Sequence, residues 1–265
     1  MNSNIVRLIQ LTDTHFFSDP SKKLCGVNTT DSLDAVISHA ESQTFTPDFY
    51  LATGDLSQDE TPESYSRLKN VFSSLGKQVY CLPGNHDEAK MMKNHLESDV
   101  IRLDKTIDLE CWKIILLSSV IPKSNAGNLS NAELGLLKKE LEKETQKNIL
   151  ITFHHNPIPM SSQWLDTMMV NNGDQFFQLI VPYENVKAVL WGHVHQQYDG
   201  EKNELKLMST PSTCVQFLPR GKNFSVDTLA PGYRWLELHP DGKIKTGIER
   251  IKNFSFIPDL TTRGY

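Results

Sequence analysis

Short apolar runs alternate with amphipathic stretches over the first three quarters of the chain. Each run is rich in β-branched or aromatic residues and is followed by polar residues or glycine. Continuous apolar runs of this kind are typical of strands buried on both faces of a sheet. The pattern predicts strands at residues 5–12, 49–53, 78–82, 114–118, 149–153 and 186–191.

Between several of these strands, apolar residues recur at helical spacing and predict helices at 31–42, 60–75 and 130–145. Thr29 or Thr30 could cap the first helix. Pro62 lies near the first turn of the second helix, and Ser130 begins a capping box that ends at Glu133. The alternation of strands and helices predicts an α/β fold.

The strand-rich part of the chain begins at about residue 196, where the helical pattern stops. Strands are predicted at 204–209, 214–217, 224–228, 233–239 and 243–250, with a hairpin turn at 239–243. Neither a Ser/Gly-rich linker nor an internal repeat separates this part from the rest. We therefore predict a single domain, residues 1–265, in which a second sheet packs on the first.

Polar side chains that can bind metals follow five of the six early strands. The segments are Asp13-Thr14-His15, Gly54-Asp55, Gly84-Asn85-His86-Asp87, His154-His155 and Gly192-His193-Val194-His195. In an open α/β sheet, ligands bind beyond the carboxyl ends of the strands. We expect these side chains to meet at one edge, where the flanking glycines let the backbone turn tightly.

The donor set is mixed nitrogen and oxygen without thiolate, which suits divalent manganese, iron or zinc. The candidate ligands are Asp13, His15, Asp55, Asn85, His154, His193 and His195. They exceed the four ligands of a tetrahedral site. Two ions that share one bridging carboxylate account for this number, and such a pair could clamp a phosphoryl group and activate a water.

Each segment alone has an ordinary explanation as a capped turn or a loop. The histidines at 193 and 195 are the stronger signal, because alternate residues of an extended chain point to one side. Six of the nine histidines lie in these segments, and His39, His95 and His239 remain as ordinary surface or core residues. The ordered set favours a metal centre over five unrelated turns.

Composition and charge narrow the possible partners. The 265 residues carry a net charge of −5, so a general basic surface for nucleic acid or anionic lipid is not expected. No apolar run approaches the roughly 20 residues that span a bilayer. The four cysteines are scattered and do not indicate a disulfide framework, and the first residues lack the apolar core of a signal peptide. Both observations favour a location in the cytoplasm.

The ordered segments from residue 13 to residue 195 resemble the signature of calcineurin-like metallophosphoesterases. The resemblance implies a four-layered α/β/β/α sandwich of two mixed sheets flanked by helices. It implies one ion held by Asp13, His15, Asp55 and His195, and a second held by Asp55, Asn85, His154 and His193. By the same resemblance, His86 is not a ligand but the catalytic residue that protonates the leaving oxygen, and Asn85, His86 and His15 face the substrate.

Segments outside the metal motifs are similar to bacterial class III 3′,5′-cyclic-AMP phosphodiesterases. These segments are residues 25–29, 210–217, 223–227 and 230–234. They could shape a nucleoside pocket, with the adenine against 25–29 or 210–213. The resemblance implies a phosphodiesterase that hydrolyses cyclic AMP to 5′-AMP by attack of a metal-activated hydroxide on phosphorus. The expected metals are iron or manganese, with zinc as a further candidate. The expected oligomeric state is a monomer or a homodimer.

Two positions depart from the pattern of that family. Many members have proline directly after the paired histidines, whereas Asn156 intervenes here, so His154 or His155 could be the ligand; we favour His154. Many relatives carry an acid three residues after the bridging aspartate, where this chain has Gln58 followed by Asp59. The acid that would orient His86 is therefore open.

Two other hypotheses stand beside cyclic-AMP hydrolysis. The same chemistry could act on a glycerophosphodiester, another cyclic nucleotide or a phosphomonoester. A chain of this fold could also serve as a scaffold without catalysis, although the complete ligand set and His86 argue against that. A nuclease is disfavoured because no basic aromatic groove is evident.

Overall fold

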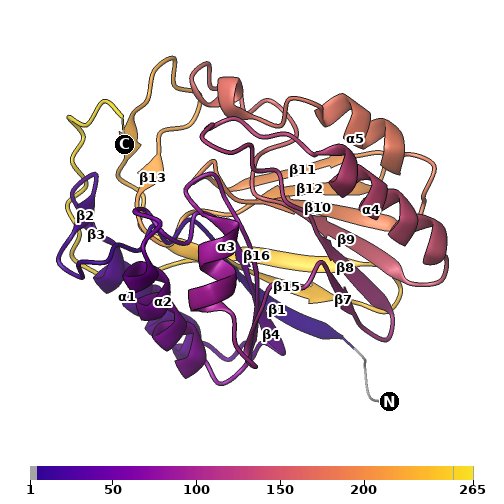
Figure 1. Cartoon of the computed structure of the whole chain (residues 1–265), viewed down its shortest axis with the longest axis horizontal. Coiled ribbons are helices and arrows are strands. Elements are labelled where there is room, and N and C mark those ends of the chain that lie inside the picture. The colour runs from indigo at the N-terminus through magenta and orange to yellow at the C-terminus, as the bar shows by residue number, and fades with distance from the viewer. Residues whose placement is uncertain (1–4, 253, 265) are drawn as a thin grey trace.

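Buried apolar strands form the centre of two mixed sheets in the computed structural model, which describes residues 5–252 and 254–264 (Figure 1). The first sheet runs, from edge to edge, β16 (Ile244–Arg250), β15 (Gly232–Leu238), β1 (Val6–Leu11), β4 (Phe49–Thr53), β5 (Gln78–Leu82) and β6 (Ile101–Arg102). The second runs β11 (Tyr198–Lys202), β12 (Leu205–Ser209), β10 (Val186–Trp191), β9 (Asn148–Thr152), β8 (Trp112–Leu116) and β7 (Thr106–Asp108). Two short pairs join β2 (Lys23–Leu24) to β3 (Val27–Asn28) and β13 (Gln216–Phe217) to β14 (Val226–Asp227).

Each sheet contains four neighbouring parallel strands. In the first sheet β1, β4, β5 and β6 run in one direction, and in the second β8, β9, β10 and β12 do so. β15 is antiparallel to β1 and to the edge strand β16, and the edge strands β11 and β7 of the second sheet are antiparallel to their neighbours. The carboxyl ends of the parallel strands therefore carry the loops in which the predicted ligands lie.

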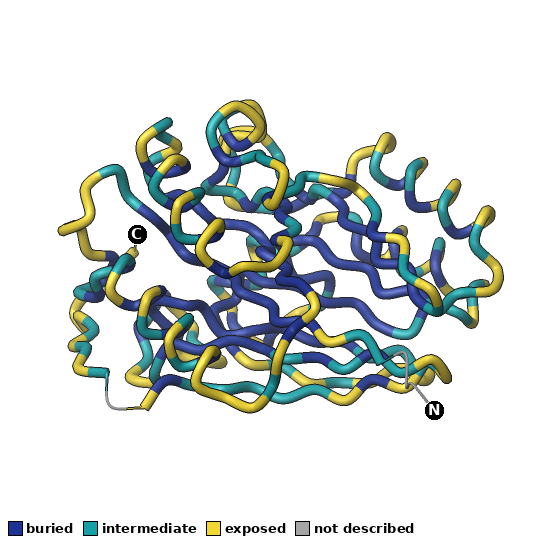
Figure 2. Tube along the Cα trace, turned by 90° about the horizontal axis from the view of Figure 1, so that it is seen from below, coloured by how far each residue is buried: buried dark blue, intermediate teal, exposed yellow. Residues whose placement is uncertain are grey.

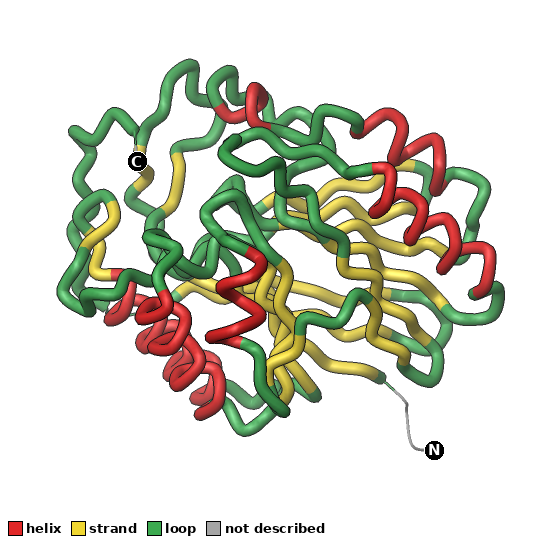
Figure 3. Tube along the Cα trace, in the orientation of Figure 1, coloured by secondary structure: helices red, strands yellow, loops and turns green. Residues whose placement is uncertain are grey.

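Helices cover the outer face of each sheet, as Figure 3 shows in red. They are α1 (Thr29–Ser42), α2 (Pro62–Ser74), α3 (Ala89–Met91), η1 (Met92–Leu96), α4 (Asn131–Lys143), η2 (Leu165–Met168) and α5 (Gly173–Ile180). Leu33 of α1 and Phe72 of α2 pack on Ile9 of β1, whereas Leu137 of α4 and Phe176 of α5 belong to the core against the second sheet.

The inner faces of the two sheets share a third apolar core (Figure 2). The first sheet contributes Leu8, Leu51, Leu82 and Leu236, and the second contributes Ile114, Leu150, Ala188 and Leu190. The order of layers is helix, sheet, sheet, helix, so the predicted α/β/β/α sandwich is confirmed. None of the described helices is both long and apolar enough to cross a bilayer.

Two details of the predicted elements need correction. Asn28, rather than Thr29 or Thr30, caps α1 by accepting a hydrogen bond from the Asp31 amide, because both threonines already lie within the helix. Apart from the short pair β13–β14, the described strands after residue 196 join the two large sheets: β11 and β12 extend the second sheet, and β15 and β16 pair beside β1. Ser130 does cap α4, and the 239–243 turn is present.

Arg234 is a buried polar link between the two sheets. It lies on β15, and its guanidinium donates to the carbonyl oxygens of Ser209 and Tyr198 and to the carboxylate of Asp199, all in or beside the second sheet. The Arg234 side chain and Ser209 are fully buried, so the Ser209 carbonyl has no water to replace this donor, whereas the Asp199 carboxylate is partly exposed.

We expect Arg234→Ala to lower the free energy of unfolding by about 3 kcal/mol, because it leaves buried carbonyls without a donor. Urea denaturation measures this loss. Arg7→Ala is the matched control, since Arg7 is half exposed and pairs with Glu237 at the surface; it should cost less than about 1 kcal/mol. Equal losses at the two positions would contradict the structural role of Arg234.

Candidate metal centre

The seven predicted ligands lie in loops that follow β1, β4, β5, β9 and β10. Asn85 is half-buried, and the other six are at most 1% exposed: Asp13, His15, Asp55, His154, His193 and His195. Since β1, β4 and β5 belong to the first sheet and β9 and β10 to the second, the site lies where the carboxyl ends of both sheets meet.

Ligand atoms from separate strands converge at this edge. Nε2 of His195 lies 3.4 Å from Oδ1 of Asp13 and 3.2 Å from Nε2 of His15. Asp55 Oδ2 lies 3.2 Å from His154 Nε2 and 3.9 Å from His15 Nε2. Asp55 is therefore between the His15 side of the cluster and the His154 side, which is the position that a bridging carboxylate requires.

Hydrogen bonds on the far side of three imidazoles fix how they point. Nδ1 of His154 donates to the Thr53 carbonyl at 2.9 Å, and Nδ1 of His195 donates to the Val215 carbonyl at 2.8 Å. Nδ1 of His15 lies 2.6 Å from Oε1 of Gln58. Partners of this kind set the tautomer of a metal-binding histidine, so each Nε2 lone pair is directed into the cluster.

Several buried polar atoms in the cluster have no hydrogen-bond partner among the described residues. They are Asn85 Oδ1, His155 Nε2 and both ring nitrogens of His193, whereas Asp55 Oδ2 and His154 Nε2 face each other at 3.2 Å. An unpaired buried polar atom costs about 1–3 kcal/mol, and a set of four in one place needs a ligand. Oxygen and imidazole donors without thiolate are the right chemistry for divalent cations. The residues present therefore fit a dimetal centre.

Five of the predicted ligands hold a left-handed backbone conformation. Their φ angles are 55° at Asp13, 46° at His15, 49° at Asp55, 63° at His193 and 49° at His195. Such conformations in residues other than glycine cost about 1–3 kcal/mol each and persist where the surroundings enforce them. Here the Asp13 amide donates to Gly54 and the His15 amide to Asp55, so the loops after β1 and β4 hold one another.

The glycines of the motifs are needed for close approach. A Cβ on Gly84 would collide with the Asp55 carboxylate, and a Cβ on Gly192 would collide with the Thr12 hydroxyl. The glycines therefore let the loops after β5 and β10 come up against those after β4 and β1.

The charges of the cluster suit cation binding. Burial lowers the pKa of His15 to about 3, and burial together with His155 and His154 holds that of His193 well below its usual range. Burial opposes both the ionisation of Asp55 and the protonation of His154, but their mutual attraction outweighs it: the pKa of Asp55 is held well below its usual value and that of His154 rises to about 9. A cation at this position would replace the His154 proton.

His155 is also buried beside the cluster. Its Nδ1 lies 2.7 Å from the Ser119 hydroxyl, and its ring centroid lies 4.6 Å from that of His193. His154, by contrast, directs Nε2 at Asp55. This geometry supports His154 as the ligand and leaves His155 as a neighbour of His193.

The acids nearest Gln58 and His86 in the sequence, Asp59 and Asp87, have partners of their own. Asp59 binds Ser18 and Thr61, and Asp87 accepts from the backbone amides of Leu56 and Ser57. Gln58 itself holds His15, a role that its sequence position alone did not reveal.

Replacing Gln58 by leucine should weaken binding of Mn²⁺ by about 10–100-fold, because His15 loses the acceptor that sets its tautomer. Titration calorimetry with the metal-free protein measures the affinity. Gln58→Glu keeps an acceptor at the same place and should bind close to wild type. Unchanged affinity in the leucine variant would refute this role.

A cleft of about 160 Å³ adjoins the cluster. Asn85, His86 and His193 line it together with Trp164 and Phe224. The His86 amide donates to Asp55 Oδ1 at 2.9 Å, and its ring packs edge-on to that of His15, with centroids 5.2 Å apart. The sequence did not identify Trp164, because it lies in a loop with no motif around it.

The expectation that adenine contacts residues 210–213 is wrong. Thr210, Ser212 and Thr213 are fully buried. Ser212 donates to the Asp13 carbonyl at 2.8 Å, and the Thr213 amide donates to the carbonyl of Thr12. This segment braces the strained loop after β1. The cleft is not lined by residues 25–29 either, whereas segment 223–227 does contribute Phe224.

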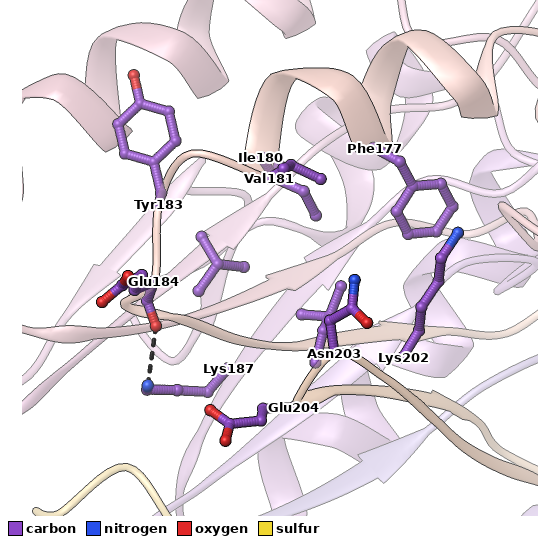
Figure 4. A pocket seen from close by; sticks show the side chains of 11 residues that line it. Phe177, Ile180, Val181, Tyr183, Glu184, Lys187, Lys202, Asn203 and Glu204 are labelled. Atoms are coloured by element: carbon purple, nitrogen blue, oxygen red, sulfur yellow. Dashed lines mark hydrogen bonds between the residues drawn. The ribbon is translucent and has the colours of Figure 1, made fainter.

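Another hollow, of about 430 Å³, lies away from the cluster (Figure 4). Its walls include Phe177 of α5, Tyr183, and Lys202 of β11. It adjoins Val186 at the beginning of β10, whereas His193 follows the other end of that strand. A molecule bound there would not reach the cluster.

Comparisons with known proteins agree with this geometry. A family model described as calcineurin-like phosphoesterase matches residues 6–197. A relative from Pseudomonas aeruginosa, 3′,5′-cyclic adenosine monophosphate phosphodiesterase CpdA, is 38% identical over 98% of this chain and 95% of its own length. The protein of the same name from Haemophilus influenzae is 39% identical over 98% of this chain and 96% of its own.

Among solved structures, a dimetal phosphatase from Danio rerio shares the fold. The TM-score is 0.60 at 12% identity, over 93% of this chain and 99% of that one. The fold, the metal-binding cluster and the family model all indicate the same class of protein. The chain belongs to the calcineurin-like phosphoesterase family.

Proposed function

We propose that this protein is a metal-dependent phosphodiesterase that hydrolyses 3′,5′-cyclic AMP to 5′-AMP. The observation that carries the proposal is its similarity, over nearly the whole chain, to enzymes named for that activity. The buried cluster of aspartates and histidines supports it, because hydrolysis of a stable phosphodiester needs concentrated positive charge.

Two divalent ions would be held by the seven ligands. Asp13, His15, Asp55 and His195 would hold one, and Asp55, Asn85, His154 and His193 would hold the other. When bound, such ions neutralise phosphoryl oxygens and lower the pKa of water. Because this charge is local, a phosphodiester can bind despite the net charge of −5.

His86 is the proposed proton donor to the leaving group. It lines the cleft, and its amide is tied to Asp55, so its position is coupled to the cluster. In the reaction, water releases a proton to solvent and its oxygen forms a bond to phosphorus, while the bond from phosphorus to the 3′-oxygen breaks. His86 gives its proton to that 3′-oxygen, while Asn85 contacts the phosphate. His15, also predicted to face the substrate, has Nδ1 on Gln58 and Nε2 in the cluster, so we assign it to metal binding alone.

Finer expectations belong to the same proposal. Iron or manganese suits the nitrogen and oxygen donors, with zinc a further candidate. A cytoplasmic location is supported by the cysteines, all four of which are free thiols. A monomer or homodimer stays a prediction, as does the organisation of residues 1–265 as a single domain.

A substrate panel tests the proposal. The purified protein, loaded with Mn²⁺, Fe²⁺ or Zn²⁺, is incubated with cyclic AMP, a glycerophosphodiester and a phosphomonoester. The proposal predicts fastest turnover of cyclic AMP. Rapid turnover of either other substrate with cyclic AMP left intact would overturn the nucleotide assignment, and absence of any turnover would favour the scaffold hypothesis.

A further inference from the structure

The cleft beside the cluster has a second, aromatic part. Besides Asn85, His86 and His193, it is lined by Trp164, Met168 and Phe224. Trp164 and Met168 come from the η2 region, in the same loop as His154 and His155, and Phe224 comes from the segment before β14. The cleft therefore joins a part that carries the proposed phosphate-binding groups to a part that is apolar.

The aromatic side chains are packed against one another and against the cluster. Trp164 contacts Phe224 edge-on, with centroids 5.1 Å apart, and contacts Phe217 at 5.3 Å. Phe217 in turn stacks on the His195 ring at 3.9 Å with an interplanar angle of 11°. The aromatic part is thus held at a fixed position relative to a proposed metal ligand.

Among the residues that the structure describes, the cleft lining contains no aspartate, glutamate, lysine or arginine, and Asn125 is its remaining polar member. Its aromatic part therefore has no charged side chain that could pair with a second charged group of a ligand, but it can pack against a planar, uncharged ring. A cyclic nucleotide has this division: a charged phosphodiester and a neutral purine joined by ribose. A glycerophosphodiester has no ring to place there.

The C-terminal segment completes the cleft. Gly264 lines it, although β16 ends at Arg250. The segment is anchored on the way: the Asp259 amide donates to the Cys25 carbonyl at 2.7 Å, and Asp259 accepts from the amide of Thr261. In Figure 1 this segment passes β2 and β3 and ends near β13.

We propose that Trp164 and Phe224 form the binding site for the purine of the substrate and so determine base recognition. The inference rests on the proposed function. It assigns specificity to Trp164, which no motif marks, and to Phe224 of segment 223–227, and it separates both from the groups that bind phosphate.

The experiment compares 5′-AMP with ribose 5-phosphate, which has the same phosphate and sugar but no base. Binding to the Mn²⁺-loaded protein is measured by calorimetry for wild type, Phe224→Ala and Phe224→Leu. The leucine variant keeps apolar volume and guards against a folding defect in the alanine variant. Phe256→Ala is the matched control, because Phe256 packs on the same apolar cluster but does not line the cleft.

Wild type should bind 5′-AMP about tenfold more tightly than ribose 5-phosphate, as base stacking on an aromatic side chain gives. Both Phe224 variants should lose most of this difference while binding ribose 5-phosphate as wild type does, and Phe256→Ala should retain it. Equal weakening of both ligands, an unchanged ratio, or the same loss in Phe256→Ala would overturn the inference. Cyclic AMP hydrolysis by wild type, assayed in parallel, distinguishes this failure from failure of the proposed function.

Discussion

Asp55→Ala should reduce bound metal from two equivalents per chain toward one or none and slow hydrolysis by at least about 10³-fold. Asp55 places its carboxylate 3.2 Å from His154 Nε2 and 3.9 Å from His15 Nε2, on both sides of the cluster. Its loss should therefore affect both proposed ions. Metal analysis of the purified variant and steady-state kinetics measure the two effects.

Asp59→Asn is the matched control for this experiment. Asp59 lies four residues further along the same loop, but its carboxylate binds Ser18 and Thr61 outside the cluster. This variant should keep both ions and nearly full activity. Retention of two ions with near-normal activity in Asp55→Ala would rule out a bridging role.

His86→Ala should lower kcat by about 10²–10⁴-fold with both ions retained, because general acid catalysis is worth that much. The loss should depend on the leaving group. A poor alkoxide leaving group, such as the ribose 3′-oxygen, needs a proton more than a nitrophenolate does. Parallel assays with cyclic AMP and bis(p-nitrophenyl) phosphate measure the difference.

His95→Ala provides the comparison for His86. His95 lies on η1, outside the cluster and the cleft, and its loss should leave both activities unchanged. If His86→Ala slows the two substrates equally, His86 binds phosphate and does not protonate the leaving group.

The parallel core of the fold could be predicted from the sequence. The strands at 49–53, 78–82 and 186–191 have the predicted bounds, because strands buried on both faces appear as unbroken apolar runs. β11 was missed because Tyr198–Lys202 is polar and largely exposed at a sheet edge. The sequence also did not predict which sheet each C-terminal strand joins, because the alternation of apolar and polar residues along a strand does not specify its antiparallel partner.

The candidate ligands could be identified because each follows a parallel strand, and parallel strands present their carboxyl ends at one edge. The hydrogen bonds that orient these ligands could not be predicted from the sequence. Gln58 and the Val215 carbonyl reach His15 and His195 through loop conformations that residue spacing does not encode. The same holds for Trp164, whose place in the cleft depends on how its loop packs. Phe224, by contrast, lies in segment 223–227, which the resemblance had singled out.

Hydrolysis of cyclic AMP in water enriched in ¹⁸O tests the central claim most directly. The Mn²⁺-loaded protein is incubated with the substrate, and the product is identified by chromatography and mass spectrometry. Attack of water on phosphorus with departure of the 3′-oxygen predicts 5′-AMP that carries one labelled oxygen on its phosphate. Formation of 3′-AMP, an unlabelled phosphate, or no product from cyclic AMP would contradict the account.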